Sequence, residues 1–246
     1  MRYAASTHVG RVRKRNEDYY YIPTEGGPDL MIAVADGMGG YRGGDVASKL
    51  GIEVLCNVFA SRSYDNLCDL EALIYDAVNA ANSAIWDYAQ DNEFLAGMGS
   101  TMVLSAFMEG HAVIANVGDS RAYLLRDGEL TQLTTDHSLV QELLDEGRIT
   151  EEEAYHHPRR NIITRALGSE DSVLVDVSRH EVREGDILML ISDGLNTQLS
   201  DTEIKGIMIK HNDLQAMCGD LIDSANEAGG HDNITIAMVK ISQEVM

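Results

Sequence analysis

The stretch LMIAVADGMGGYRGG, residues 30–44, contains the pattern that decides the fold and points to a site. An apolar run of strand length stops at one carboxylate, Asp36, and a glycine-rich segment with few side chains follows. A carboxylate at the rim of a buried sheet is costly unless something cationic meets it. Glycine at position 37 lets the backbone carbonyl approach a cation closely, because glycine has no Cβ. The stretch therefore predicts a buried strand that ends at an ion-binding site.

The same design recurs along the chain. Acidic residues stand at the head or the end of other apolar runs, at Glu17 with Asp18, Asp119, Asp193 and Asp232. One Asp-Gly pair at a strand end is usually only a turn, but five such sites together are poorly explained as turns. Hard divalent cations prefer oxygen ligands, which aspartate supplies without histidine or cysteine. The recurrence predicts a shared divalent metal centre.

A basic run, RVRKR at residues 11–15, stands out in an acidic chain. Such a run of basic residues usually lies on a solvent-exposed surface and has no specific function. If the segment were a strand, alternation would place Arg11, Arg13 and Arg15 on one face and Lys14 on the other. Arginine next to a carboxylate–metal centre suits a phosphate group, because its planar fork binds two oxygens at once. Metals, arginine and water together indicate phosphoester hydrolysis.

The apolar pattern predicts many strands and a few long helices. Strands are expected at residues 19–22, 30–35, 101–107, 112–117, 122–125, 173–177, 187–191 and 234–239. The Asp127-Gly128 pair predicts a hairpin within RAYLLRDGELTQL. Helices are expected at residues 45–60 and where apolar faces run over 70–88 and 214–225. This mixture favours one α+β domain, with antiparallel sheets covered by helices.

Composition excludes several classes of protein. The 246 residues carry a formal net charge of −21, which argues against a nucleic-acid partner, since phosphate neutralisation needs clustered Lys and Arg. No apolar run is long enough to span a membrane, and the N-terminal residues lack the apolar core of a signal peptide. Three cysteines without a CxxC pair suggest neither a disulfide framework nor a thiolate zinc site. A cytoplasmic protein is expected.

Seven segments, in this order, resemble the metal-dependent serine/threonine protein phosphatases of type 2C, in their compact bacterial branch. They are GRVRKRNEDYY, VADGMGG, GMGSTMV, NVGDSRAYLLRDGELTQLTTDHS, GRITEEEAYHHPRRNIITRALG, GDILMLISDGL and HDNITIAMV. The resemblance covers essentially the whole chain. It implies two packed antiparallel β-sheets flanked by helices on both outer faces, an αββα sandwich. It also implies a single phosphatase domain over residues 1–246, with a flap beside the active site at residues 137–168.

The resemblance assigns a two-metal centre that holds Mn²⁺ or Mg²⁺. By this likeness Asp36 bridges both ions and the backbone carbonyl of Gly37 holds one of them. Asp193 and Asp232 hold the other ion, and Asp18 acts near the metals.

Four further roles follow from the same likeness. Asp119 matches the position of a weaker third metal, and Arg13 matches the arginine that binds the substrate phosphate. Glu17 is a candidate contact to metal-bound water. Relatives read DGMGGH where this chain has Tyr41, and that histidine is a candidate proton donor to the leaving group. Tyr41 therefore becomes the candidate general acid here.

The resemblance implies hydrolysis of phosphoserine and phosphothreonine in proteins by a water that bridges two metals. The expected partners are phosphorylated proteins, including a serine/threonine kinase whose action the enzyme opposes, and a monomer is expected. One alternative is a phosphatase-like module that binds or senses phosphoproteins with little turnover, which the intact Arg13, Asp36, Asp193 and Asp232 disfavour. The other is a small-phosphoester hydrolase, which ranks lower because no P-loop is present.

Overall fold

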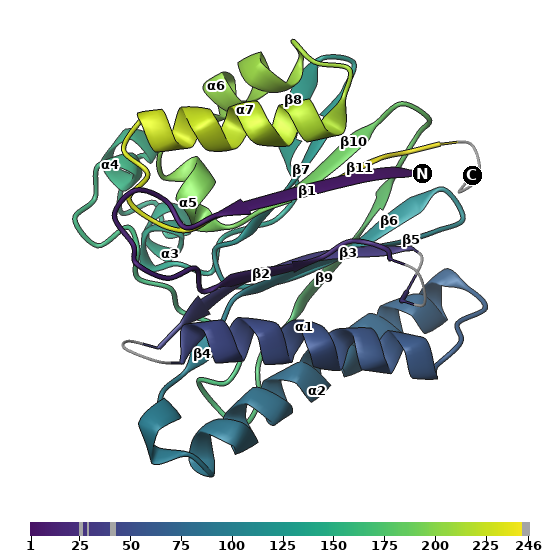
Figure 1. The fold of residues 1–246 in the computed structure, drawn as a ribbon, viewed down its shortest axis with the longest axis vertical. Helices are drawn as coiled ribbons and strands as arrows, with labels where there is room; N and C mark the ends of the chain where they lie inside the picture. Colours follow the sequence, from purple (N-terminus) through teal and green to yellow (C-terminus); the bar gives the residue numbers. More distant parts are fainter. Residues whose placement is uncertain (25–26, 29, 40–42, 243–246) are drawn as a thin grey trace.

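Two β-sheets lie face to face, and helices cover both outer faces (Figure 1). This arrangement is seen in a computed structural model that describes residues 1–24, 27–28, 30–39 and 43–242. One buried apolar cluster fills the space between the two sheets. Each sheet also packs against its helices through a further apolar cluster of its own. The expected αββα sandwich is confirmed.

The first sheet has the strand order β1-β11-β10-β7-β8, with antiparallel neighbours. Its strands are β1 (Arg2–His8), β7 (Arg121–Arg126), β8 (Glu129–Gln132), β10 (Ile187–Ile191) and β11 (Ile234–Lys240). The predicted hairpin joins β7 to β8, and Asp127 and Gly128 both have the positive φ, 52° and 79°, that a two-residue turn of this kind requires. The prediction had omitted β1.

The second sheet has the order β2-β3-β5-β6-β9, and the short β4 pairs with the end of β3. Its strands are β2 (Asp18–Tyr21), β3 (Met31–Met38), β4 (Gly99–Ser100), β5 (Met102–Met108), β6 (His111–Val117) and β9 (Asp176–Glu181). The strand expected at residues 173–177 is wrong in its position, because β9 begins at Asp176. This edge strand is largely exposed, so its residues carry no apolar run to mark it.

Helices cover both sheets, and the three that the apolar faces predicted are present at residues 44–61, 67–90 and 214–227. Helices α1 (Gly44–Ser61) and α2 (Leu67–Gln90) pack on the second sheet, while α6 (Asp201–Met208) and α7 (Leu214–Glu227) pack on the first. Short helices α5 (Asp193–Asn196) and η1 (Glu93–Leu95) complete these layers. Among the residues described, no helix combines the length and apolar character needed to cross a membrane.

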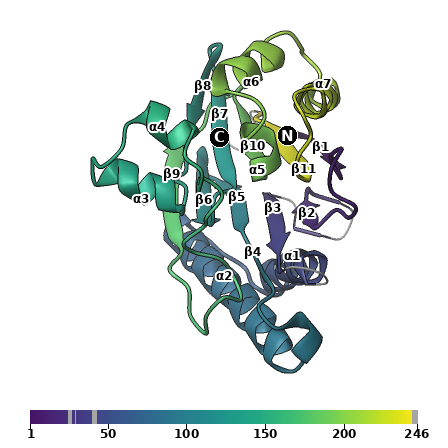
Figure 2. The same ribbon diagram turned by 90° about the vertical axis from the view of Figure 1, so that its left-hand side faces the viewer.

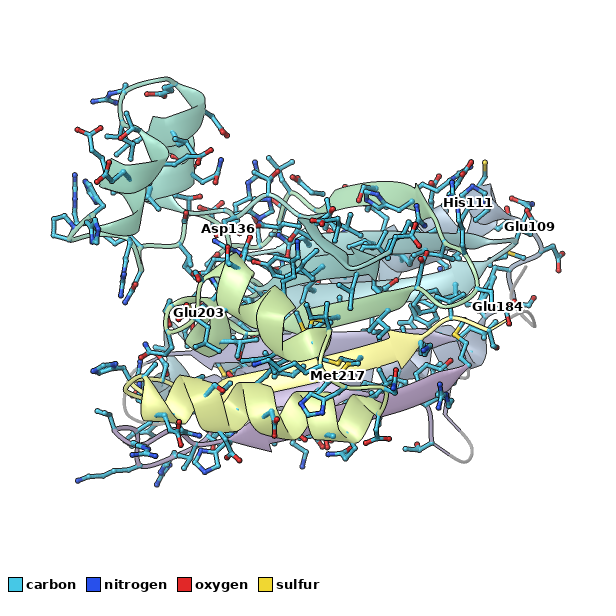
Figure 3. The ribbon with its side chains drawn as sticks, turned by 90° about the horizontal axis from the view of Figure 1, so that it is seen from above. Glu109, His111, Asp136, Glu184, Glu203 and Met217 are labelled. Carbon is cyan, nitrogen blue, oxygen red and sulfur yellow. The ribbon has the colours of Figure 1, made fainter. Side chains whose placement is uncertain are left out.

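Helices α3 (Leu139–Asp145) and α4 (Glu151–Tyr155) stand away from the two sheets (Figure 3). The labelled Asp136 lies at the base of this projection. None of residues 139–150 is buried, and Thr150 and Glu153 cap α4 through a reciprocal pair of hydrogen bonds. The projection is therefore held by local helix capping far more than by apolar packing.

We expect the backbone amides of residues 139–155 to exchange with deuterium faster than those of β10. Segments with few buried apolar contacts open locally at a lower free energy than a central strand. Every residue of β10 is buried, whereas none of α3 is. Hydrogen–deuterium exchange followed by mass spectrometry measures the difference, and equal protection of the two segments would contradict the expectation.

Candidate metal centre

The predicted acidic residues meet at one edge of the sandwich, where strands from both sheets end (Figure 2). Asp36 lies on β3, Asp193 begins α5 directly after β10, and Asp119 lies between β6 and β7. A cavity of about 330 Å³ is open at this edge. Seven of the predicted residues line it, namely Arg13, Glu17, Asp36, Gly37, Asp119, Asp193 and Asp232. Tyr41 lies outside the described residues.

Asp18 lies directly opposite Asp36 in the antiparallel pair of β2 and β3. Like charges in that position destabilise a sheet unless a proton or a cation intervenes. The Ser192 hydroxyl donates a hydrogen bond of 2.7 Å to Oδ2 of Asp18. Within the described part of the chain, Oδ1 of Asp18 is buried and accepts no hydrogen bond. A buried carboxylate oxygen left in this state marks a position that suits a cation.

Burial and mutual repulsion make these carboxyl groups hard to ionise. Burial is the main cause that raises the pKa of Asp18 to about 7, of Asp119 to about 8 and of Asp193 to about 6. The charge of Asp193 adds to the effect on Asp18 and Asp119, and that of Asp232 adds to the effect on Asp193. The pKa of Asp36 is raised well above its ordinary value by burial and by Asp18. Such a cluster holds protons or cations at neutral pH.

The backbone around Asp36 is fixed by hydrogen bonds and by close packing. The Asp36 N–H donates to Oγ1 of Thr101 at 3.0 Å, and the Thr101 N–H donates to the Asp36 carbonyl at 2.8 Å. A Cβ on Gly37 would collide with the carbonyl oxygens of Gly44 and Glu17. Position 37 therefore needs glycine for a reason that the sequence did not reveal, the packing of the start of α1 against β3. The approach of its carbonyl to a cation stays a prediction.

Asp119 lies between two firmly held neighbours. The Gly118 N–H donates to Nδ1 of the buried His137 at 3.0 Å, and the His137 N–H donates to the Gly118 carbonyl at 2.9 Å. On the other side, Arg121 forms a two-pronged ion pair with Asp136, whose shortest N···O distance is 2.7 Å. These contacts position the Asp119 loop at the mouth of the cavity.

Arg13 lies on a loop, so the strand alternation considered for residues 11–15 is wrong. Strand β1 ends at His8 and β2 begins at Asp18, and all five residues of the run are exposed. Arg13 reaches the cavity, where its Nη2 donates to Oδ2 of Asp232 at 2.7 Å. The side chain is 52% exposed, which leaves much of its guanidinium accessible to a ligand.

Sequence reasoning missed Asn233, which organises the loops around the site. Its buried side chain donates to the carbonyls of Val9 and Arg15, each at 2.9 Å, and accepts from the Glu17 N–H at 2.8 Å. Ser192 and Thr101, which hold Asp18 and Asp36, were missed as well. Asn233 and Ser192 each adjoin a predicted aspartate in the sequence, so a polar residue beside a metal-ligand candidate is the available signal for these two. Thr101 adjoins none and had no such signal.

The residues present fit hard divalent cations. The side-chain donors that face the cavity include four aspartates and one glutamate, and Gly37 offers a backbone carbonyl. Among the described residues, no three side chains of His, Cys, Asp or Glu already converge to enclose an ion. Hard divalent cations prefer such oxygen donors.

Comparison with known proteins gives three consistent findings. The family model described as protein phosphatase 2C matches residues 7–234. A serine/threonine phosphatase, stp, of Listeria monocytogenes is 40% identical over 235 residues, which covers 95% of this chain and 93% of that protein.

Two solved structures of phosphatases, one of them from Mycobacterium tuberculosis, are similar throughout. The structure of the serine/threonine phosphatase PstP/Ppp has a TM-score of 0.90 at 40% identity and covers 98% of this chain and 99% of that one. The catalytic domain of PstP, in complex with two manganese ions, has a TM-score of 0.84 at 40% identity and covers 97% of each chain.

Proposed function

The chain belongs to the protein phosphatase 2C family, and from this premise we propose that it is a metal-dependent serine/threonine protein phosphatase. The observation that carries the proposal is the cluster of buried carboxyl groups with raised pKa that lines one cavity together with Arg13. The similar PstP domain, whose structure is in complex with two manganese ions, supports a two-metal centre.

We propose that Asp36, Asp193 and Asp232, with the backbone carbonyl of Gly37, hold two Mn²⁺ or Mg²⁺ ions, with Asp18 beside them. When bound, such ions lower the pKa of a coordinated water and offset negative charge on the phosphoryl oxygens. Asp18 supports the centre from β2, where Ser192 orients one of its oxygens.

Three more residues complete the proposed site. Asp119 would hold a weaker third ion together with Asp193, since both line the same cavity. Glu17 would contact metal-bound water, in keeping with a pKa that burial raises. Proton donation to the leaving serine or threonine oxygen by Tyr41 stays a prediction that rests on the sequence alone.

Arg13 would bind and orient the phosphate of the substrate. Its guanidinium already contacts a carboxylate at the rim of the cavity, and a phosphate offers the same pair of oxygens to the same planar fork. Binding a substrate would then exchange the carboxylate partner for the phosphate without moving the backbone of the loop.

Replacing Arg13 with alanine is expected to raise KM for a phosphothreonine peptide about tenfold, because one charge-assisted contact to the phosphate is lost. A smaller effect on kcat is expected, since the contact exists before and during the reaction. Steady-state kinetics at saturating Mn²⁺ measure both parameters. An Arg13→Ala variant with unchanged KM and reduced kcat would assign the arginine to the chemical step alone.

A manganese titration tests the proposed function against its two alternatives. The proposal expects hydrolysis of a phosphothreonine peptide that depends on Mn²⁺ and exceeds the hydrolysis of a nucleotide. Binding of the peptide without turnover would support a sensing module, and preferential hydrolysis of the nucleotide would support a small-phosphoester hydrolase.

The expected partners are phosphorylated proteins, by analogy with relatives that are described as serine/threonine phosphatases. We propose that these substrates include a serine/threonine kinase whose action the enzyme opposes, that the enzyme acts as a monomer and that it works in the cytoplasm.

A further inference from the structure

The basic segment Arg11–Val12–Arg13–Lys14–Arg15, here called the basic ribbon, concentrates charge beside the candidate metal centre. It contains four of the nineteen Lys and Arg residues of a chain whose net charge is −21. All five residues are exposed. In the described part of the chain, Arg13 pairs with Asp232, while Arg11, Lys14 and Arg15 form no ion pair. Three cations that flank Arg13 in the sequence are therefore available to a ligand.

The backbone of the basic ribbon is fixed to the loop that carries Asp232. The Arg11 N–H donates to the Gly230 carbonyl at 2.7 Å, and the Asn233 side chain donates to the Arg15 carbonyl at 2.9 Å. Gly10 has a φ of 80°, and a Cβ there would collide with the Asp232 carbonyl oxygen. The cations thus project from an anchored loop, so a ligand would gain their charge with little ordering of the backbone.

The two flanks of the cavity differ in charge. The loop between β1 and β2, which contains the basic ribbon, lies on one side of α5, and helices α3 and α4 lie on the other (Figure 2). On the α3–α4 side, a neighbouring cavity of about 440 Å³ shares Asp119 and Asp193 with the metal centre, and its lining adds Asp136, Glu151 and Asp201 together with Arg121 and Arg160. Acidic residues outnumber arginines on the α3–α4 side and Arg121 there is already paired with Asp136, so an anionic group next to the scissile phosphate is attracted more strongly on the ribbon side.

We infer that the basic ribbon is a specificity-determining surface for substrates that carry an anionic group, a carboxylate or a second phosphate, on one side of the phosphorylated residue. The inference rests on the proposed phosphatase function and names the class of phosphosite that the same centre takes. Arg13 serves the scissile phosphate, while Arg11, Lys14 and Arg15 bind the anionic neighbour. Guanidinium and ammonium groups suit both carboxylates and phosphates, so the chemistry is shared by the two sources.

The test compares phosphothreonine peptides of equal length. One peptide has neutral flanks, and others have glutamates before or after the phosphorylated residue. Two further kinds have lysines in those places or a neighbouring phosphoserine. With Mn²⁺ present, wild-type kcat/KM should be about tenfold higher for an acidic flank on one side than for neutral flanks, and lower for lysines there. The preference should shrink as NaCl is added. The glutamate and phosphoserine peptides distinguish the two sources of the anion.

The variant that replaces Arg11, Lys14 and Arg15 with glutamine should lose this preference. It should keep its kcat/KM for the neutral peptide and for a nitrophenyl phosphate, because these residues do not serve the scissile phosphate. A matched variant with glutamine at Arg62, Arg183 and Lys210, which are exposed elsewhere, lowers the net charge equally and should keep the preference.

An acidic-flank preference that persists in the ribbon variant, or that is absent in the wild type, would overturn the inference while the phosphatase function stands. The same holds if the matched variant loses the preference to the same extent. If wild-type protein hydrolyses none of the phosphopeptides with Mn²⁺, the proposed function fails and the inference fails with it.

Discussion

An Asp36→Asn variant is expected to hydrolyse a phosphothreonine peptide at least about a thousandfold more slowly than the wild type at saturating Mn²⁺. Metal ions contribute several kcal/mol of charge stabilisation in the transition state, and about 4 kcal/mol corresponds to a factor of a thousand. Asparagine keeps the shape of the side chain and loses the charge that would bridge two cations. The loss of activity should be largest for substitution of Asp36, because β3 places this residue among the other carboxylates.

Calorimetric titration with Mn²⁺ should show weakened binding in the same Asp36→Asn variant. A suitable control is Asp87→Asn, since Asp87 is an exposed acid on α2 and its loss changes the net charge equally. The control should retain the wild-type rate. If the Asp36→Asn variant hydrolysed the peptide at the wild-type rate, or if the wild-type protein kept its full rate in excess chelator, the proposed metal-dependent function would be wrong.

In the presence of chelator, the free energy of unfolding is expected to fall as the pH rises from about 4 to about 8. The folded-state pKa of Asp18 is about 7 and that of Asp119 about 8, against an ordinary value of 3.8. Over this window the unfolded chain has already released protons that the folded chain still holds, so a higher pH favours unfolding. The change is on the order of a few kcal/mol for one such buried carboxyl group.

Thermal unfolding at several pH values measures this loss of stability, and Mn²⁺ should largely abolish it, since the cation replaces the protons. The Asp18→Asn variant removes one of the buried charges and should unfold at a higher temperature than the wild type at pH 8 in chelator. A chelated wild-type protein whose stability is unchanged or increases over this range would show that the carboxylates do not repel one another in the folded state.

The apolar patterns predicted most of the fold, and the misses have physical reasons. Strand β10 was predicted at its true bounds, because burial on both faces excludes polar residues, and the other strands with apolar runs were predicted within a few residues of theirs. Strand β1 was missed because RYAASTH has no such run, and it is recognisable only by its pairing with β11 along its whole length. Helix α6 was missed as well, although Ser200 and Glu203 form a capping box at its start.

The candidate site likewise contains residues that the sequence predicted and residues that it did not. The aspartates were predictable because burying a charge at the end of an apolar strand costs free energy unless a cation or a hydrogen-bond donor compensates it. Asn233 was not, since its importance comes from two backbone segments that it joins across more than two hundred residues of sequence. The strand alternation considered for residues 11–15 is wrong, because these residues form a loop. The proton-donor role of Tyr41 stays a prediction, because Tyr41 lies outside the described residues.

The pairing of β1 with β11 has a consequence for the order of events during synthesis. Strand β1 is synthesised long before β11, so it must wait for its hydrogen-bonding partner. Loop closures of this length are slow compared with helix formation, so α1 and α2 can form while β1 is still unpaired. Asp36 is present from an early stage, but Asp232 and Asn233 arrive just before β11. The proposed metal centre therefore cannot be complete until the segment that contains Asp232 and β11 has been synthesised.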